Sequence, residues 1–357
     1  MERFGLIGLP NAGKSSLYNA LTGGGALTTA YPFSTKDSNV GVAKVPDHRL
    51  DALAGMSKSR NVVSAAVQVV DVGGLVEGAS RGEGLGNRFL AGIREVDAIV
   101  YVLRSFVDDD VTGLTDPVEQ LTILELELAL ADLESVEGQI VKRQKAARAD
   151  KSLADEVAAL ENAATALRDG HPIYRAGLDG PTRDLLRPYF LLTNKPVLAV
   201  LNVGDDQLAD VATVEDPVRA ELGGVEVLSI CAQIEAEVSQ LDSAERAEML
   251  EGLALGEGAL PRLVNSAYHL LGLRTFLTTG DKESRAWTFR AGAKAPECAG
   301  VIHSDLQRGF IRAEVIRWDE LLEIGSWNRA KELGKLRVEG KDYEVVDGDV
   351  LEIRFNV

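Results

Sequence analysis

Residues Gly8–Ser15, which read Gly-Leu-Pro-Asn-Ala-Gly-Lys-Ser, constrain the fold of this chain more than any other segment. They match the phosphate-binding pattern G-x-x-x-x-G-K-[ST] at every fixed position. The apolar residues Phe4–Ile7 before the loop predict a buried strand, and Ser16–Leu21 after it predict the start of a helix. Because this motif works between a strand and a helix, the segment predicts a P-loop fold that binds a nucleotide.

The predicted chemistry of this loop is anion binding. The glycines let the backbone curl so that successive N–H groups face one anion, and the positive end of the following helix adds to that field. We expect Lys14 to reach the β- and γ-phosphates, where it acts in catalysis, and Ser15 to bind Mg²⁺. The other loop residues expected to contact the nucleotide are Asn11, Ala12, Gly13 and Ser16.

The composition predicts a cytoplasmic protein with a sizeable core. The 357 residues are 45% hydrophobic and 26% charged, which suits two or three globular domains. No apolar run reaches membrane-spanning length, and the residues before the first strand leave no room for a signal peptide. Two cysteines, Cys231 and Cys298, and four scattered histidines predict neither a disulfide framework nor a zinc site.

The net charge of −17 argues against non-specific binding of nucleic acid by the whole surface, because phosphate contacts need Lys and Arg. Two local basic patches remain candidates for RNA contact. One is Lys142–Lys145 with Arg148, and the other comprises Arg308, Arg312 and Arg317. The alternative for each patch is solvated charge on an exposed face.

Short apolar runs alternate with helical stretches in the first half of the chain and again after residue 190. The runs that predict strands are Ala66–Val70, Ala98–Leu103, Val197–Leu201 and Val225–Ile230. Together with the first strand they predict a doubly wound α/β sheet covered on both faces. We assign residues 1–115 and 191–272 to this nucleotide-binding domain.

Residues 116–190 interrupt this pattern and predict an inserted helical hairpin. Asp116, Pro117 and Glu119 have the spacing of a helix start. The predicted apolar seams are Ile123, Leu126, Leu130, Leu133 and Ile140 in the first helix, and Leu153, Val157, Leu160, Ala164 and Leu167 in the second. We expect an antiparallel coiled coil that projects toward a partner. The alternative is two helices that lie on the main core.

The last segment, residues 273–357, predicts a separate small domain of strands and helices. Ala286–Arg290, Ile311–Val315 and Val350–Phe355 alternate between apolar and polar residues, as half-buried strands do.

Switch-like elements follow the phosphate loop. Asp71 and Gly74 have the D-x-x-G spacing, in which Asp71 would hold a Mg²⁺-bound water and the Gly74 N–H would sense the γ-phosphate. Thr35 stands where a switch threonine closes over the metal. Leu75 occupies the position where many GTPases have the glutamine that orients the attacking water. We therefore predict slow turnover, or another group that places the water.

The base-reading motif leaves the base open. A guanine reader is normally N-K-x-D, but the matching strand end here is Asn202-Val203-Gly204-Asp205. Asp205 could accept from guanine, or Asn202 could read an adenine edge. A P-loop kinase is the weakest alternative, because D-x-x-G favours hydrolysis.

Taken in order, these motifs resemble the YchF / Obg-like ATPases, in the Obg group of translation-factor-class P-loop NTPases. Gly8–Ser15 resembles the family's G-L-P-N-V-G-K-S, and Asp71–Ser80 resembles its D-[IV]-A-G-L-V-x-G-A-S. Asn202 with Asp205 occupies its N-x-x-E position. Residues Cys231, Ala232 and Gln233 resemble its base-contacting last loop, and the C-terminal segment resembles its TGS-like β-grasp domain.

This resemblance implies an Mg²⁺-dependent NTPase that prefers ATP over GTP, with the ribosome or the translation machinery as its partner. The helical hairpin and the TGS-like domain would make the contact, through RNA among other surfaces. Asn11 resembles a loop asparagine that is linked to K⁺ use in related NTPases. No membrane contact is implied.

Three departures from the family pattern qualify these expectations. Asp205 replaces Glu, which keeps an Obg-type GTPase as an alternative, and Gly73 replaces Ala. Gly113 stands where many members carry a catalytic histidine, in a shortened loop. We therefore expect basal hydrolysis to be weak or dependent on a partner. A nucleotide-gated ribosome-binding module with negligible turnover is the second alternative.

Overall fold

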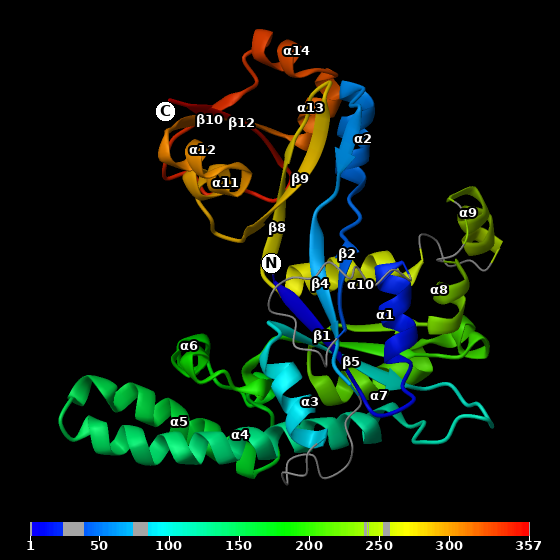
Figure 1. Ribbon diagram of the computed structural model, residues 1–357, viewed down its shortest axis with the longest axis vertical. Helices are drawn as coiled ribbons and strands as arrows, with labels where there is room; N and C mark the ends of the chain where they lie inside the picture. The colour runs from blue at the N-terminus through cyan, green and yellow to red at the C-terminus, as the bar shows by residue number, and fades with distance from the viewer. Residues whose placement is uncertain are drawn as a thin grey trace. The chain divides into compact units, whose positions relative to one another are not determined.

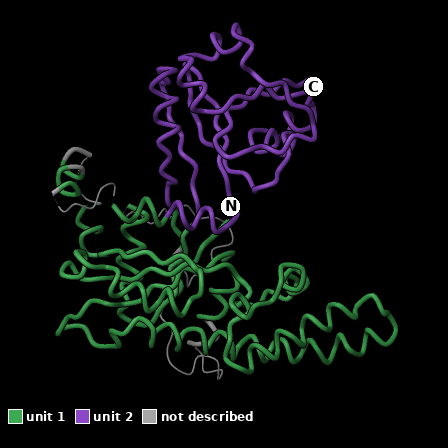
Figure 2. The backbone as a smooth tube through the Cα atoms, turned by 180° about the vertical axis from the view of Figure 1, so that it is seen from behind, with its two compact units in different colours: residues 1–42, 68–263 green, residues 43–67, 264–357 purple. Residues whose placement is uncertain are grey.

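The computed structural model describes residues 2–23, 39–73, 85–238, 241, 243–252 and 258–356. The chain forms two compact units, which Figure 2 shows in green and purple. The P-loop unit comprises residues 1–42 and 68–263, and the C-terminal unit comprises residues 43–67 and 264–357. The sequence prediction places residues 43–67 with the nucleotide-binding domain, whereas the structure groups them with the C-terminal segment.

A six-stranded sheet in the order β2-β4-β1-β5-β6-β7 forms the centre of the P-loop unit (Figure 1). The pairings β4–β1, β1–β5, β5–β6 and β6–β7 are all parallel. Every residue of β5 and β6 is buried, as expected for apolar strands covered on both faces. The strands are β1 (Arg3–Ile7), β2 (Asn39–Lys44), β4 (Ala66–Asp71), β5 (Ala98–Arg104), β6 (Val197–Asn202) and β7 (Val227–Ile230).

Helices cover both faces of this sheet, which confirms the predicted doubly wound fold. Ile93 of α3, Leu124 of α4 and Val218 of α7 belong to one core with one sheet face. Leu17 of α1 lies with Val102 and Val200 on the opposite face. The helices of this unit are α1 (Lys14–Thr22), α3 (Leu85–Arg94), α4 (Pro117–Ala147), α5 (Ala154–Arg168), α6 (Gly180–Leu186), α7 (Ala212–Leu222), α8 (Ala232–Val238) and α9 (Ser243–Gly252). Helix α10 (Ala259–Leu270) begins in this unit, and its residues from 264 onward belong to the C-terminal unit. Within the described ranges, no helix has both the length and the apolar character that a membrane crossing requires.

Helices α4 and α5 form an antiparallel hairpin, and they lie side by side in Figures 1 and 2. Glu137 bonds to Arg168 and Gln144 bonds to Glu161, so residue numbers rise along one helix as they fall along the other. The helix start is confirmed, because the Asp116 side chain accepts the N–H groups that follow Pro117.

The predicted apolar seam of α4 is partly wrong. Leu126 and Leu130 are 48% and 41% exposed, whereas Leu124 and Leu128 are fully buried. The first half of α4 packs on the sheet and not on α5, which changes the direction of its buried face. Only the second half, around Val136, packs with α5. Helix α4 therefore combines the two alternatives: it begins on the main core and ends in the hairpin.

The C-terminal unit contains a second six-stranded sheet, in the order β11-β10-β12-β8-β9-β3. Strands β8 and β9 form an antiparallel pair, and β12 pairs parallel with β8 and antiparallel with β10. Helix α11 packs on this sheet through Cys298 and Ala299, which gives the β-grasp arrangement predicted for this segment. The strands are β3 (Asn61–Val63), β8 (Leu273–Thr278), β9 (Glu283–Arg290), β10 (Phe310–Arg317), β11 (Arg337–Glu339) and β12 (Asp349–Phe355). The helices are α2 (His48–Ser57), α11 (Ala295–Ile302), α12 (Ser304–Arg308), α13 (Trp318–Ile324) and α14 (Trp327–Glu332).

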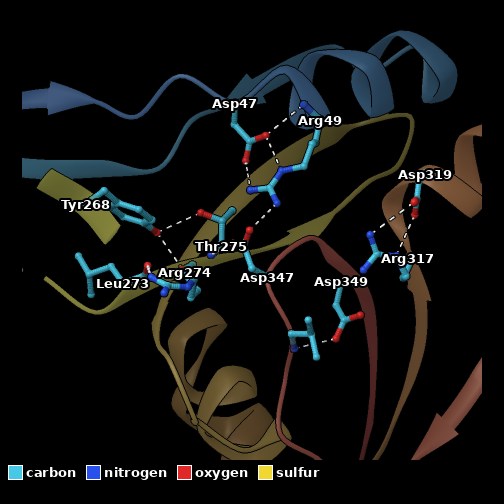
Figure 3. A network of polar contacts seen from close by, with 11 residues as sticks. Asp47, Arg49, Tyr268, Leu273, Arg274, Thr275, Arg317, Asp319, Asp347 and Asp349 are labelled. Atoms are coloured by element: carbon cyan, nitrogen blue, oxygen red, sulfur yellow. Dashed lines mark hydrogen bonds and ion pairs between the residues drawn. The ribbon is translucent and has the colours of Figure 1, made fainter. Parts of the chain in front are cut away.

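Backbone pairing and an ion pair attach residues 43–67 to this unit. Strand β3 pairs parallel with β9. Figure 3 shows the Arg49 guanidinium between Asp47 and Asp347, at 2.8 and 2.7 Å. The Asp347 carboxylate also accepts the Thr275 N–H at 2.8 Å, so it joins three segments that are distant in the sequence.

Replacing Asp347 with Asn should lower the stability of the C-terminal unit by about 1–2 kcal/mol at pH 7, because a hydrogen-bonded charge is lost. Burial opposes the charge of Asp347, but Arg49 and the Thr275 amide hold the pKa of this carboxyl below its usual 3.8. Its contribution is therefore complete above the unfolded-state pKa and disappears as the pH falls through the lower folded-state pKa. Urea unfolding from pH 7 to pH 3 tests this, since all three tryptophans (Trp287, Trp318 and Trp327) lie in this unit and report it by fluorescence.

The matched control for this experiment is Asp342→Asn. Asp342 also pairs with a cation, Lys294, but its side chain is 96% exposed. An exposed pair contributes little, so we expect a change below about 0.5 kcal/mol. Equal effects of the two substitutions would contradict the role given to Asp347.

Candidate nucleotide site

Two glycines of the phosphate loop are required by close contacts. The loop connects β1 to α1, and a Cβ atom on Gly8 would lie 2.3 Å from the carbonyl oxygen of Val102. A Cβ atom on Gly13 would lie 2.1 Å from the Asn202 Nδ2, and Gly13 has a φ of 92°. A side chain at Gly8 would displace the backbone, and one at Gly13 would displace the Asn202 amide and strain a left-handed φ, so these glycines allow the close approach of the loop to the strands beside it.

Asn11 adopts the left-handed region with a φ of 64°, which Asn tolerates better than most residues. Its Nδ2 donates to the carbonyl oxygen of Thr112 at 3.1 Å. The loop is therefore held on one side by the segment that follows β5.

Helix α1 begins at Lys14, directly after the loop, with Gly13 as its N-cap and no side chain that caps it. The N–H groups of a first helical turn have no acceptor within the helix, so they are available to an anion. Ser15 and Ser16 in this turn are exposed. The loop thus ends in the donor-rich helix terminus that the sequence predicts.

Lys14 is buried, with 7% of its surface exposed, and its Nζ donates to the Leu9 carbonyl oxygen at 2.9 Å. Burial lowers the pKa of the Lys14 ammonium, and the charge of Asp71 opposes this shift. The structure therefore places a desolvated cation beside the loop, close to one carboxylate.

Asp71 lies at the end of β4 and accepts the Ser15 hydroxyl through Oδ2, at 3.0 Å. Its other oxygen, Oδ1, is buried and has no hydrogen-bond partner among the described residues. The buried Tyr18 hydroxyl likewise has no partner within the described ranges, and burial together with the Asp71 charge raises its pKa. The Asp71 Oδ1 atom and the Ser15 hydroxyl are hard oxygen donors, the kind of ligand that suits Mg²⁺.

Asn202, at the end of β6, connects two loops through its amide. Its Nδ2 donates to the Ala12 carbonyl oxygen at 3.0 Å, and its Oδ1 accepts the Ala232 N–H at 3.0 Å. The side chain is 6% exposed, so both bonds are shielded from water. Asn202 therefore fixes the phosphate loop against the last loop, and its amide is occupied by these bonds.

The other predicted base-site residues differ in exposure. Val203 is buried in the core, and burial raises the pKa of the buried Cys231 thiol. Asp205 and Gln233 are exposed, and Oδ1 of Asp205 accepts the Asp206 N–H. Among these residues, Asp205 and Gln233 are the side chains that a base could reach. The predicted switch residues Thr35 and Gly74, together with Leu75, lie outside the described residues.

Gly113, where the family pattern has histidine, lies next to the phosphate loop. A Cβ atom on Gly113 would lie 3.9 Å from the Pro10 carbonyl oxygen, and its φ is 123°. This position is therefore adjacent to the phosphate loop, and a glycine offers no side chain there.

Sequence reasoning did not identify Arg104 as part of this site. It is 2% exposed, and it donates to the Thr112 carbonyl that also accepts from Asn11. The sequence feature that could have identified Arg104 is its position, as a charged residue directly after the apolar run Ala98–Leu103.

Two protein families match this chain. Residues 3–143 match the family described as "50S ribosome-binding GTPase", and residues 273–356 match the C-terminal YchF-GTPase family described as "Protein of unknown function (DUF933)". Proteins called "Ribosome-binding ATPase YchF" are 45% identical in Bacillus subtilis and 42% identical in Escherichia coli O157:H7, with 99% of both chains covered.

A solved structure is similar over nearly the whole length. The Schizosaccharomyces pombe YchF GTPase has a TM-score of 0.87 and 29% identity, and the match covers 99% of this chain and 97% of that one. This chain belongs to the YchF family of P-loop nucleotide hydrolases.

Proposed function

We propose that this protein is a cytoplasmic, Mg²⁺-dependent ATPase switch that engages the ribosome. The observation that carries the proposal is the convergence of the phosphate loop, Asp71 and Asn202 at the carboxyl ends of parallel strands β1, β4 and β6 of one sheet. The names of the relatives, ribosome-binding ATPases, support the choice of nucleotide and partner.

The phosphates would be held by the N–H groups of residues 11–16 and by Lys14. Ser15 and Asp71 would hold Mg²⁺, with Thr35 as a further ligand. When bound, Mg²⁺ neutralises charge on the phosphate oxygens and lowers the barrier to phosphoryl transfer. Asn11 would serve a K⁺ ion through its Oδ1, because its Nδ2 already donates to Thr112.

ATP is the proposed nucleotide, and GTP is the alternative. Asn202 would act in positioning, since both ends of its amide are already bonded. Asp205 is exposed and would face the base, together with Ala232 and Gln233 of the last loop. An aspartate at this position is also what a guanine reader has, and the yeast relative is called a GTPase.

Turnover in isolation should be slow, because Gly113 offers no group to orient the attacking water. A nucleotide-gated binding module with negligible turnover is therefore the second candidate function. It is favoured by the same observation, a glycine at position 113 beside the Pro10 carbonyl.

The hairpin tip is the stronger candidate for RNA contact. Lys142, Lys145 and Arg148 are exposed there on a chain of net charge −17. In the C-terminal patch, Arg308 and Arg317 are paired with aspartates of their own segments. Among the described residues, one cation of the tip patch forms an ion pair, Arg143 with Glu156, against two of the three in the C-terminal patch, so the tip leaves more cations available to phosphate.

Competition between ATP and GTP for one fluorescent analogue tests the nucleotide, in Mg²⁺ with and without K⁺. We expect ATP to compete at least about tenfold better, because a base whose hydrogen-bonding edge does not match the protein groups around it leaves those groups unpaired. Better competition by GTP would establish the alternative. Removal of Mg²⁺ with a chelator should weaken binding of either triphosphate.

Phosphate release with and without ribosomes separates the switch from the gated module. A slow basal rate that rises on ribosome addition supports the ATPase switch. No release under either condition, with ATP still bound, supports the gated module.

A further inference from the structure

We propose that Arg104 is a positioning residue that holds the loop of residues 105–116 on the phosphate loop and connects helix α4 to the nucleotide site. For its effect on nucleotide affinity, this inference rests on the proposed function. The hydrogen bonds that connect α4, Arg104 and the phosphate loop join described residues and need no ligand.

Arg104 collects carbonyl groups from its own loop. Its Nε donates to the Phe106 oxygen at 3.0 Å, and its Nη1 donates to the oxygens of Val111 and Thr112 at 3.1 and 3.3 Å. The guanidinium carbon lies 4.4 Å from the centroid of the Phe106 ring. The forked donors of this one buried side chain therefore hold both ends of the seven-residue segment 106–112 together.

The Thr112 carbonyl is the point where this loop meets the phosphate loop. It accepts from Arg104 and from Asn11 Nδ2, at 3.3 and 3.1 Å. Asn11 has a left-handed backbone, which directs the N–H groups that follow it. Movement of the Thr112 carbonyl would release Asn11, so Arg104 stabilises the phosphate loop through one shared acceptor.

Gln120 of α4 fixes the other side of the same loop. Its Oε1 accepts the backbone N–H of Arg104 at 2.9 Å. Its Nε2 donates to the backbone carbonyl oxygens of Arg104 and Leu114, at 2.7 and 3.2 Å. Gln120 is 1% exposed, and it lies in the helix that continues into the hairpin. A displacement of α4 would therefore reach Asn11 through Gln120, Arg104 and Thr112.

Burying the Arg104 guanidinium costs free energy, and strand β5 does not itself need a charged residue at its end. In the described part of the chain, no ion pair to Arg104 is found, and its charge is compensated by carbonyl oxygens and the Phe106 ring. An apolar residue would end this buried strand without desolvating a charge. The charge is explained by the loop that it organises.

A double-mutant cycle on nucleotide affinity tests the path. Arg104→Lys keeps the charge but loses the forked donors, and Asn11→Gly removes the side-chain amide while tolerating the left-handed backbone. We expect each to raise the Kd of a fluorescent ATP analogue about five- to tenfold, and the double variant to be no worse than about tenfold. A purely structural role of Arg104 would make the two effects multiply, which would overturn the inference.

The matched control is Arg183→Lys. Arg183 lies in the same unit and donates to the side chain and the backbone of Asn194, both at 3.0 Å. It makes no contact with the phosphate loop among the hydrogen bonds of the described residues, so its Kd should stay within about twofold of wild type.

Hydrogen–deuterium exchange without nucleotide separates this inference from the proposed function. Arg104→Lys should increase amide exchange in residues 105–116 and also in residues 8–13. If the Arg104→Lys variant does not fold, Gln120→Met provides a second test. Methionine has a similar volume but cannot make the Gln120 hydrogen bonds, so amide exchange should increase in the same two segments. Exchange that increases only in residues 105–116 would refute the connection. If wild type binds no nucleotide, the proposed function fails, while the exchange result still decides the path.

Discussion

Replacing Lys14 with alanine is expected to abolish nucleotide binding while the protein stays folded. Lys14 is 7% exposed and burial lowers the pKa of its ammonium, so the charge is held where water screens it poorly. Truncating one partner of a buried charge pair costs about 2–5 kcal/mol, or roughly 30- to 5,000-fold in affinity. Titration with a fluorescent ATP analogue measures the loss.

The free protein should tolerate the Lys14→Ala substitution, because it removes a desolvated charge whose hydrogen bond goes to a loop carbonyl. Its melting temperature should be equal to or above that of wild type. Lys151→Ala, at an exposed lysine of the same unit, serves as the control and should bind normally. Unchanged ATP affinity in the Lys14 variant would remove the basis of the proposed site.

Replacing Asn202 with alanine should have the second largest effect, on both stability and affinity. The substitution leaves the Ala12 carbonyl and the Ala232 N–H buried without their partner. Each of the two unsatisfied groups costs about 1–3 kcal/mol, so the free energy of unfolding of the P-loop unit should fall by about 2–6 kcal/mol. Nucleotide affinity should fall at least about tenfold, since the phosphate loop loses its link to the last loop.

Asn194→Ala provides a closely matched control. Asn194 also uses both ends of its amide, accepting from the Arg183 side chain and donating to the Arg183 carbonyl. Its loss should destabilise the same unit without changing the Kd of the folded protein. Circular dichroism follows stability here, because this unit contains no tryptophan. Equal affinities of the two variants would show that the Asn202 link is not needed for binding.

The sequence predicted the central elements of the P-loop unit well. Strands β5 and β6 lie within one or two residues of their predicted ends, and the helix after Asp116 begins where its cap predicts. These features depend on local signals, namely continuous apolar runs and a capping side chain. The D-x-x-G aspartate and the loop serine meet at 3.0 Å, because both follow adjacent parallel strands.

Predictions that required knowledge of a packing partner were less successful. The buried face of α4 differs from the predicted seam, because Leu124 and Leu128 pack on the sheet and Leu126 is exposed. The 3-4 spacing alone does not reveal which face a helix buries. Residues 43–67 carry no local signal for a C-terminal partner. Their place depends on Arg49 meeting Asp347, 298 residues away.

By itself, the sequence determined the phosphate loop, the core strands and the family. Each of these follows from short patterns whose physical meaning is local: backbone freedom at glycine, apolar burial and helix capping. The tertiary structure alone decided that Asn202 bridges two loops, that Arg104 organises the loop beside Asn11, and that α4 divides its packing between sheet and hairpin. These roles depend on which distant groups share a hydrogen bond or a buried face, and chain folding brings those groups together.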